Sequence, residues 1–118
     1  MSQPRERKTA VAYVRISSDN QVGGLSVSSQ EAKIRQWCAQ RGYDLVKLFQ
    51  DDGRSGYTDD IRKRPQFAAL LEQLPQLRPD TVVVYSLDRW ARSISVAADS
   101  FRALASLNIG FASVTEPQ

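Results

Sequence analysis

The stretch TAVAYVRISSDN, residues 9–20, decides the fold that this sequence predicts. Its first half is apolar and rich in β-branched residues, which is typical of a strand buried on both faces of a sheet. Arg15 then interrupts the apolar run, and Ser17 follows where the strand should give way to a loop. A buried strand that ends in an arginine and a serine suggests a chemical task at that end.

Strands and helices alternate along the rest of the chain. After a first strand over residues 9–16, we expect strands over residues 43–49, 80–86 and 109–114. Helices are expected to begin at the capping pair of Ser28 and Glu31, at Pro65, and near Ile94. This alternation predicts an α/β domain with three layers, in which a parallel-type sheet of four or more strands carries helices on both faces. We assign residues 1–8 to a flexible leader and residues 9–118 to one domain.

The composition excludes several classes of site. The 118 residues include one cysteine, Cys38, and no histidine, so we expect neither an internal disulfide nor a zinc site. A magnesium site made of carboxylates and water stays open at this point. The single cysteine agrees with a reducing cytoplasm, and no apolar run reaches the roughly 20 residues that span a bilayer. We therefore expect a cytoplasmic protein without a membrane partner.

The positive charge is carried mainly by arginine, with twelve Arg against four Lys and a formal net charge of +3. Arginine presents a planar fork that binds two phosphate oxygens together, whereas lysine acts as a point charge. The charge is compatible with a polyanion as partner without requiring one, because a modest positive excess is common on ordinary surfaces.

Polar residues gather at one predicted edge of the sheet. Ligands of open α/β sheets bind beyond the carboxyl ends of the strands. Taken one at a time, these residues have ordinary roles in loops, turns and surface ion pairs. Their convergence from separate segments favours a shared site. The residues expected at this edge are Arg15, Ser17, Gln30, Asp51, Asp52, Arg54, Arg62, Arg64, Asp88, Arg89 and Arg92.

The chemistry that fits this set of residues is phosphoryl transfer. Its transition state spreads negative charge over the phosphate oxygens, which arginines stabilise without a metal. The sequence offers no histidine to activate a serine, so we expect Arg15 and its neighbours to favour the alkoxide of Ser17 by lowering its pKa. Asp88 would either exchange a proton with the leaving oxygen or orient an arginine.

Several ordered motifs resemble the catalytic domain of the serine recombinases, the resolvase and invertase family. They are YVRISSDNQ, LSVSSQ, DDGRSG, RP and LDRWARS, and the resemblance extends from residue 10 to about residue 115. It implies that Ser17 attacks a DNA phosphodiester, becomes joined to the 5′ phosphate and releases a 3′ hydroxyl. It also implies a reaction without a cofactor or a metal, strand exchange within a tetramer built from dimers, and religation.

The resemblance assigns roles to particular residues of this chain. Arg15 and Ser17 match the R-x-S motif of the family, and Gln30 matches the glutamine that opens its first helix. Asp52, rather than Asp51, matches the acid of the D-x-x-x-G turn. Two further matches complete the set of predicted site residues: Arg64 with the arginine of the mobile loop, and Asp88, Arg89 and Arg92 with the D-R-x-x-R element.

Three features set expectations for this chain in particular. The interval from Ser17 to Gln30 is longer than in the smallest resolvases and is similar to that of large integrases and transposases. Trp90 stands where an aliphatic residue is more usual, and we expect it to pack. The long dimer-building helix and the DNA-binding domain of the family are absent, so residues 1–118 alone should not recombine DNA. We also expect the loop from Asp52 to Arg64 to be mobile, with Arg64 away from Ser17.

Two other functions are alternatives to recombination. A metal-dependent phosphotransfer domain has a similar sheet, but it requires an acidic pair after the first strand, where Arg-Ile-Ser stands in this chain. A non-catalytic DNA-binding or interaction domain could keep the same fold. The complete set of nucleophile and arginines argues against that loss of function.

Overall fold

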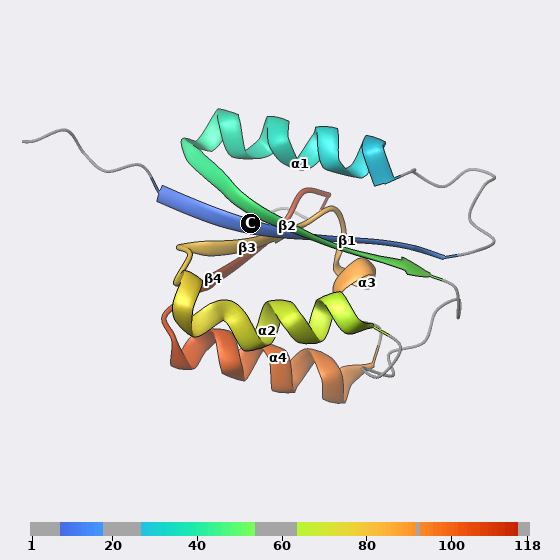
Figure 1. The fold of residues 1–118 in the computed structure, drawn as a ribbon, viewed down its shortest axis with the longest axis vertical. Helices are drawn as coiled ribbons and strands as arrows, with labels where there is room; N and C mark the ends of the chain where they lie inside the picture. Colours follow the sequence, from blue (N-terminus) through green and yellow to red (C-terminus); the bar gives the residue numbers. More distant parts are fainter. Residues whose placement is uncertain (1–7, 18–26, 54–63, 92, 116–118) are drawn as a thin grey trace, which may run out of the picture.

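The computed structural model describes residues 8–17, 27–53, 64–91 and 93–115. Four parallel strands form its sheet in the order β2-β1-β3-β4 (Figure 1). Their bounds are β1 (Lys8–Ser17), β2 (Tyr43–Gly53), β3 (Thr81–Val84) and β4 (Gly110–Ser113). β1 lies at the centre of the sheet, between β2 and β3, and every residue of β3 is buried. The predicted parallel sheet is confirmed.

Helices cover both faces of this sheet, which confirms the predicted three layers. Figure 1 shows α1 (Val27–Arg41) on one face and both α2 (Pro65–Leu77) and α4 (Ile94–Ser106) on the other. The core is accordingly divided in two. One apolar cluster joins Ile34, Trp37 and Cys38 of α1 to the sheet, and the other joins Phe67, Leu70 and Leu74 of α2 to the opposite face.

Three local differences from the sequence prediction bear on the site. β2 continues to Gly53, four residues beyond its predicted end, so the two acidic residues after Gln50 belong to a strand rather than to a loop. α1 begins at Val27, which places Ser28 inside the first turn instead of at the cap. A short helix, α3 (Leu87–Trp90), replaces the expected link between β3 and α4. Among the described residues, no helix has the length and apolar character needed to cross a membrane.

Candidate active site at the carboxyl ends of β1 and β3

The order of the strands creates a topological switch point between β1 and β3. β1 and β3 are neighbours, yet the chain leaves β1 towards α1 on one face and leaves β3 towards α3 and α4 on the other (Figure 1). Such a switch point is where open α/β sheets bind their ligands. β1 ends there at Ser17, and α3, which packs against β1, brings Asp88 and Arg89 to the same edge.

The end of β1 is held from the side of α1. Arg15 is buried, and Asp51 is its register partner on β2. Gln30, which is fully buried in the first part of α1, donates a hydrogen bond from Nε2 to the carbonyl oxygen of Arg15 at 3.3 Å. This contact fixes the backbone two residues before Ser17 and brings Gln30 and Arg15 together at this edge.

Asp51 occupies a buried position that sequence reasoning passed over in favour of Asp52. Its carboxylate accepts hydrogen bonds from the Tyr13 hydroxyl at 2.7 Å and from the backbone N–H groups of Gln66 and Phe67, each at 3.0 Å. The first N–H groups of a helix lack partners within it, so Asp51 of β2 caps α2 from outside. The residue at the N-cap, Arg64, makes no side-chain cap of its own, and that gap in the sequence pattern was the available signal.

The Tyr13 hydroxyl lies at the centre of this buried polar group. Burial raises the pKa of the Tyr13 phenol well above its usual range; the nearby Arg64 guanidinium opposes that rise, and the Asp51 carboxylate adds to it. Tyr13 therefore stays neutral and donates a hydrogen bond to Asp51. Its position on β1, two residues before Arg15, joins the capped start of α2 to the strand that carries Ser17.

Arg64, which the sequence placed at the end of a mobile loop, is buried inside the protein. Its side chain is 1% exposed. Nε donates to the Tyr13 hydroxyl at 3.3 Å, and a terminal nitrogen donates to the Trp90 carbonyl at 2.6 Å. The guanidinium carbon also lies 3.9 Å from the centroid of the Phe67 ring. A flat, weakly hydrated cation is accommodated well by such aromatic walls, which explains why this arginine is buried.

Trp90 anchors α3 in the core, which confirms that it packs. Its ring is fully buried and lies 4.7 Å from the Phe67 ring and 5.3 Å from the Phe111 ring, centroid to centroid. Its Nε1 donates a hydrogen bond to Ser100 Oγ of α4 at 2.8 Å. The backbone of α3 is thus fastened by its last residue, immediately after Asp88 and Arg89.

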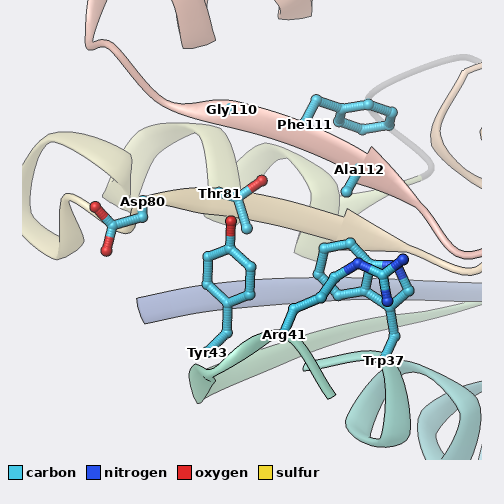
Figure 2. A pocket seen from close by; sticks show the side chains of 8 residues that line it. All are labelled: Trp37, Arg41, Tyr43, Asp80, Thr81, Gly110, Phe111 and Ala112. Atoms are coloured by element: carbon cyan, nitrogen blue, oxygen red, sulfur yellow. The ribbon is translucent and has the colours of Figure 1, made fainter. Parts of the chain in front are cut away.

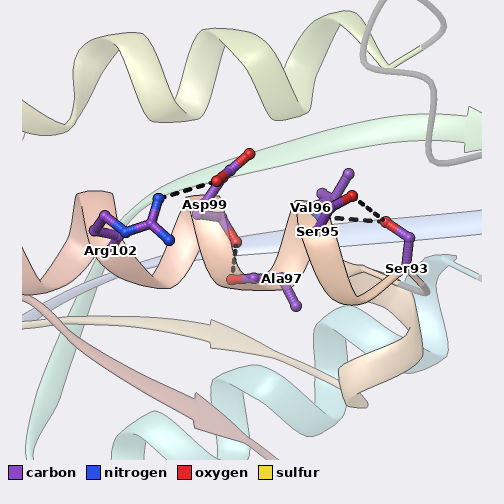
Figure 3. Close-up of polar contacts among 7 residues, drawn as sticks. Ser93, Ser95, Val96, Ala97, Asp99 and Arg102 are labelled. Atoms are coloured by element: carbon purple, nitrogen blue, oxygen red, sulfur yellow. Dashed lines mark hydrogen bonds and ion pairs between the residues drawn. The ribbon is translucent and has the colours of Figure 1, made fainter.

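The start of α4, which follows α3 in the chain, has a side-chain cap of its own. Figure 3 shows Ser93, whose Oγ accepts a hydrogen bond from the Val96 N–H at 3.1 Å and so caps the helix. On the exposed side of α4, Asp99 and Arg102 form an ion pair at 3.1 Å, a contact that contributes little to stability.

Several residues expected at this edge of the sheet fall outside the part of the structure that is described. Arg92 does so entirely, and so do Arg54 and Arg62. For Ser17, Asp52, Asp88 and Arg89 the backbone is placed in β1, β2 or α3, whereas their side chains lie outside the described part. Their chemical roles stay predictions. Within the described ranges, no group of three or more His, Cys, Asp or Glu side chains could hold a metal ion.

A pocket of about 310 Å³ lies at the opposite edge of the sheet. Its lining includes Tyr43, Thr81 and Gly110, the first residues of β2, β3 and β4 (Figure 2). There the rings of Trp37 and Tyr43 stack with their centroids 5.5 Å apart. The guanidinium carbon of Arg41 lies 4.5 Å from the centroid of the Trp37 ring. The pocket is separate from the switch point, because it opens at the amino ends of the strands.

Comparisons with known proteins agree with this geometry. The family model for the resolvase N-terminal domain matches residues 10–118. The catalytic domain of TP901-1 integrase superposes with a TM-score of 0.72 at 25% identity, over 91% of this chain and 77% of that one. A resolvase family site-specific recombinase from Streptococcus pneumoniae has a TM-score of 0.76 at 22% identity, over 92% of this chain and 72% of that one. An uncharacterized immunity region protein of Bacillus phage phi105 is 34% identical over 70 residues, which are 58% of this chain and 82% of that protein.

Proposed function

The chain belongs to the resolvase N-terminal domain family, and we propose that it is the catalytic domain of a site-specific DNA recombinase in which Ser17 is the nucleophile. The observation that carries this proposal is the position of Ser17. It ends strand β1 at the switch point, and α3, whose sequence includes Asp88 and Arg89, packs against the same strand. The longer interval between Ser17 and Gln30 favours a protein of the large integrase or transposase type.

The proposed reaction exchanges one phosphodiester for another. Ser17 Oγ attacks the phosphorus and forms a P–O bond to the 5′ phosphate, while the bond from phosphorus to the 3′ oxygen breaks. The serine proton passes to a base, and the leaving 3′ oxygen takes up a proton. The reverse attack by a 3′ hydroxyl of another strand restores the DNA and frees Ser17. No cofactor is needed to supply energy, because the number of phosphodiester bonds is unchanged.

Arginines supply the stabilisation of the transition state in this proposal. Arg15, Arg89 and Arg92 would donate hydrogen bonds to the phosphate oxygens as negative charge accumulates on them. Asp88 would take part in proton transfer or orient an arginine. Asp52, near the end of β2, would be a further acidic residue of the site. Gln30 supports the site indirectly, through its hydrogen bond to the Arg15 carbonyl.

We also propose the setting in which this chemistry takes place. DNA is the partner, which suits action in the cytoplasm, and the full-length protein assembles into dimers and tetramers to exchange strands. Residues 1–118 alone should bind DNA weakly and fail to recombine it, because catalysis is expected to require assembled subunits and a separate reader of the DNA sequence.

The test uses the full-length protein and a DNA substrate that traps the covalent intermediate. We expect mass spectrometry to find the 5′ phosphate on Ser17, and Ser17→Ala to abolish cleavage while site binding persists. Ser18→Ala is the matched control and should cleave normally. Arg15→Lys should raise the activation free energy of the chemical step by roughly 2–4 kcal/mol, because lysine keeps the charge and loses the planar fork of donors.

Two outcomes would redirect the assignment. A phosphotyrosine adduct would show that a tyrosine, and not Ser17, is the nucleophile. Cleavage that stops when a chelator is added would favour the metal-dependent alternative.

A further inference from the structure

Four elements meet in one buried cluster directly behind the candidate active site. Tyr13 comes from β1, Asp51 from β2, Arg64 from the residue before α2, and Trp90 from the end of α3. All four side chains are buried, at 4% exposure or less. The catalytic elements β1 and α3 are thus connected through a cluster to which α2 and β2 also contribute.

The contacts of Arg64 are directional and mostly shielded from water. It donates to the Tyr13 hydroxyl and to the Trp90 carbonyl, and its flat face covers the Phe67 ring. To reach a DNA phosphate, this guanidinium would have to give up both hydrogen bonds and the aromatic contact. Removing one partner of a buried charged group is costly, so these contacts hold the arginine in place.

The contact with Trp90 matters because α3 is a single helical turn. The last carbonyl groups of a helix have no partner within it. Arg64 supplies such a partner to the Trp90 carbonyl at 2.6 Å. The same guanidinium reaches Tyr13, which lies four residues before Ser17 on β1. One side chain therefore joins the strand that carries Ser17 to the helix that carries Asp88 and Arg89.

We propose that Arg64 is a positioning residue, which fixes α3 to β1 through the Trp90 carbonyl and the Tyr13 hydroxyl and does not contact the DNA phosphate. The effect of Arg64 on catalysis rests on the proposed function. Its role in holding α3 against β1 does not, because that role concerns the protein without DNA.

The first experiment measures hydrogen exchange on residues 8–115 in the chain without DNA. The Ala91 N–H donates to the Leu87 carbonyl and reports on α3. In Arg64→Gln this amide should exchange about tenfold faster, as expected when a hydrogen bond to a charged group is lost. Arg41→Gln is the matched control, because it removes an arginine stacked on an aromatic ring at the far edge of the sheet. Unchanged protection of Ala91 in Arg64→Gln would overturn the proposal.

Two further variants keep the test decisive if Arg64→Gln folds poorly. Tyr13→Phe removes only the hydroxyl and should loosen α3 in the same direction, by less. Arg64→Lys keeps the charge but not the paired donors, so it should fail to restore protection of Ala91. Full restoration by lysine would show that charge alone suffices and would contradict a fork-dependent positioning role.

The second experiment separates positioning from phosphate contact in the full-length protein. Loss of an arginine that contacts a phosphate lowers the slope of log Kd against log salt by about 1. Arg64→Gln should leave this slope unchanged and still slow cleavage. A slope lowered by about 1 would mean that Arg64 contacts DNA, against the proposal. If Ser17→Ala still cleaves, the proposed function fails, while the exchange of Ala91 continues to test the positioning role.

Discussion

Replacing Trp90 by leucine should destabilise the domain by about 3 kcal/mol, and the structure indicates where that loss arises. Truncating a buried aromatic residue to alanine costs about 3–5 kcal/mol, and leucine refills part of the space. Contacts with the Phe67 and Phe111 rings, at 4.7 and 5.3 Å, are lost, each worth roughly 0.5–1.5 kcal/mol beyond the buried area. The hydrogen bond from Nε1 to Ser100 adds about 1 kcal/mol.

Urea unfolding followed by circular dichroism measures this loss. With a slope of about 1–3 kcal/mol per molar urea, a loss of about 3 kcal/mol should lower the midpoint by about 1–3 M while the slope stays the same. Ser100→Ala keeps the aromatic packing and removes the hydrogen bond from the indole together with the hydroxyl's own bond to the Ala97 carbonyl, so it should cost about 1 kcal/mol. A loss below about 1 kcal/mol for Trp90→Leu, or an equal loss for both variants, would show that the aromatic packing does not anchor α3 as argued.

Two other perturbations test separate features of the fold. Because burial raises the pKa of Tyr13, the unfolded chain releases this proton first, so the free energy of unfolding should fall as pH rises above about 10. In urea titrations between about pH 9 and pH 11, Tyr13→Phe should show a shallower fall, and an identical fall would exclude Tyr13 as its source. Arg78 has φ 44° at the end of α2, so Arg78→Gly should stabilise the domain by about 0.5–1 kcal/mol in thermal unfolding. Arg102→Gly, inside α4, should instead destabilise it by about 1 kcal/mol, and a loss of stability in both would contradict the role given to φ.

The layered sheet could be predicted from the sequence because its signals are local. The run TVVV is β-branched at every position, which is typical of a strand, and it forms β3. Pro65 opens α2 as expected for the first position of a helix. The rule that ligands bind at the carboxyl ends of parallel strands then brought Arg15, Ser17 and the α3 segment to one edge before any side chain was placed.

The buried polar cluster could not be predicted, because it depends on strand length and on contacts that are distant in sequence. With β2 expected to end at Phe49, Asp51 was assigned to a loop. Because β2 continues to Gly53, Asp51 lies on the same face of the strand as Phe49, whose side chain packs in the cluster under α2. Arg64 was expected at the end of a mobile loop, and only the folded arrangement of Tyr13, Phe67 and Trp90 explains its burial.

Because β1 lies between β2 and β3 and is synthesised first, its pairing with β3 is delayed during translation. β1 pairs with β3 from Ala10 opposite Thr81, and the Thr9 N–H donates to the Asp80 carboxylate across 71 positions of sequence. At roughly 5–20 residues per second, roughly 4–14 s separate the synthesis of these partners. Until β3 has been synthesised, one edge of the apolar strand β1 lacks its native partner and can pair wrongly or bind chaperones. The serine proposed to cut DNA is thus made early, yet its surroundings assemble only after most of the domain has been translated.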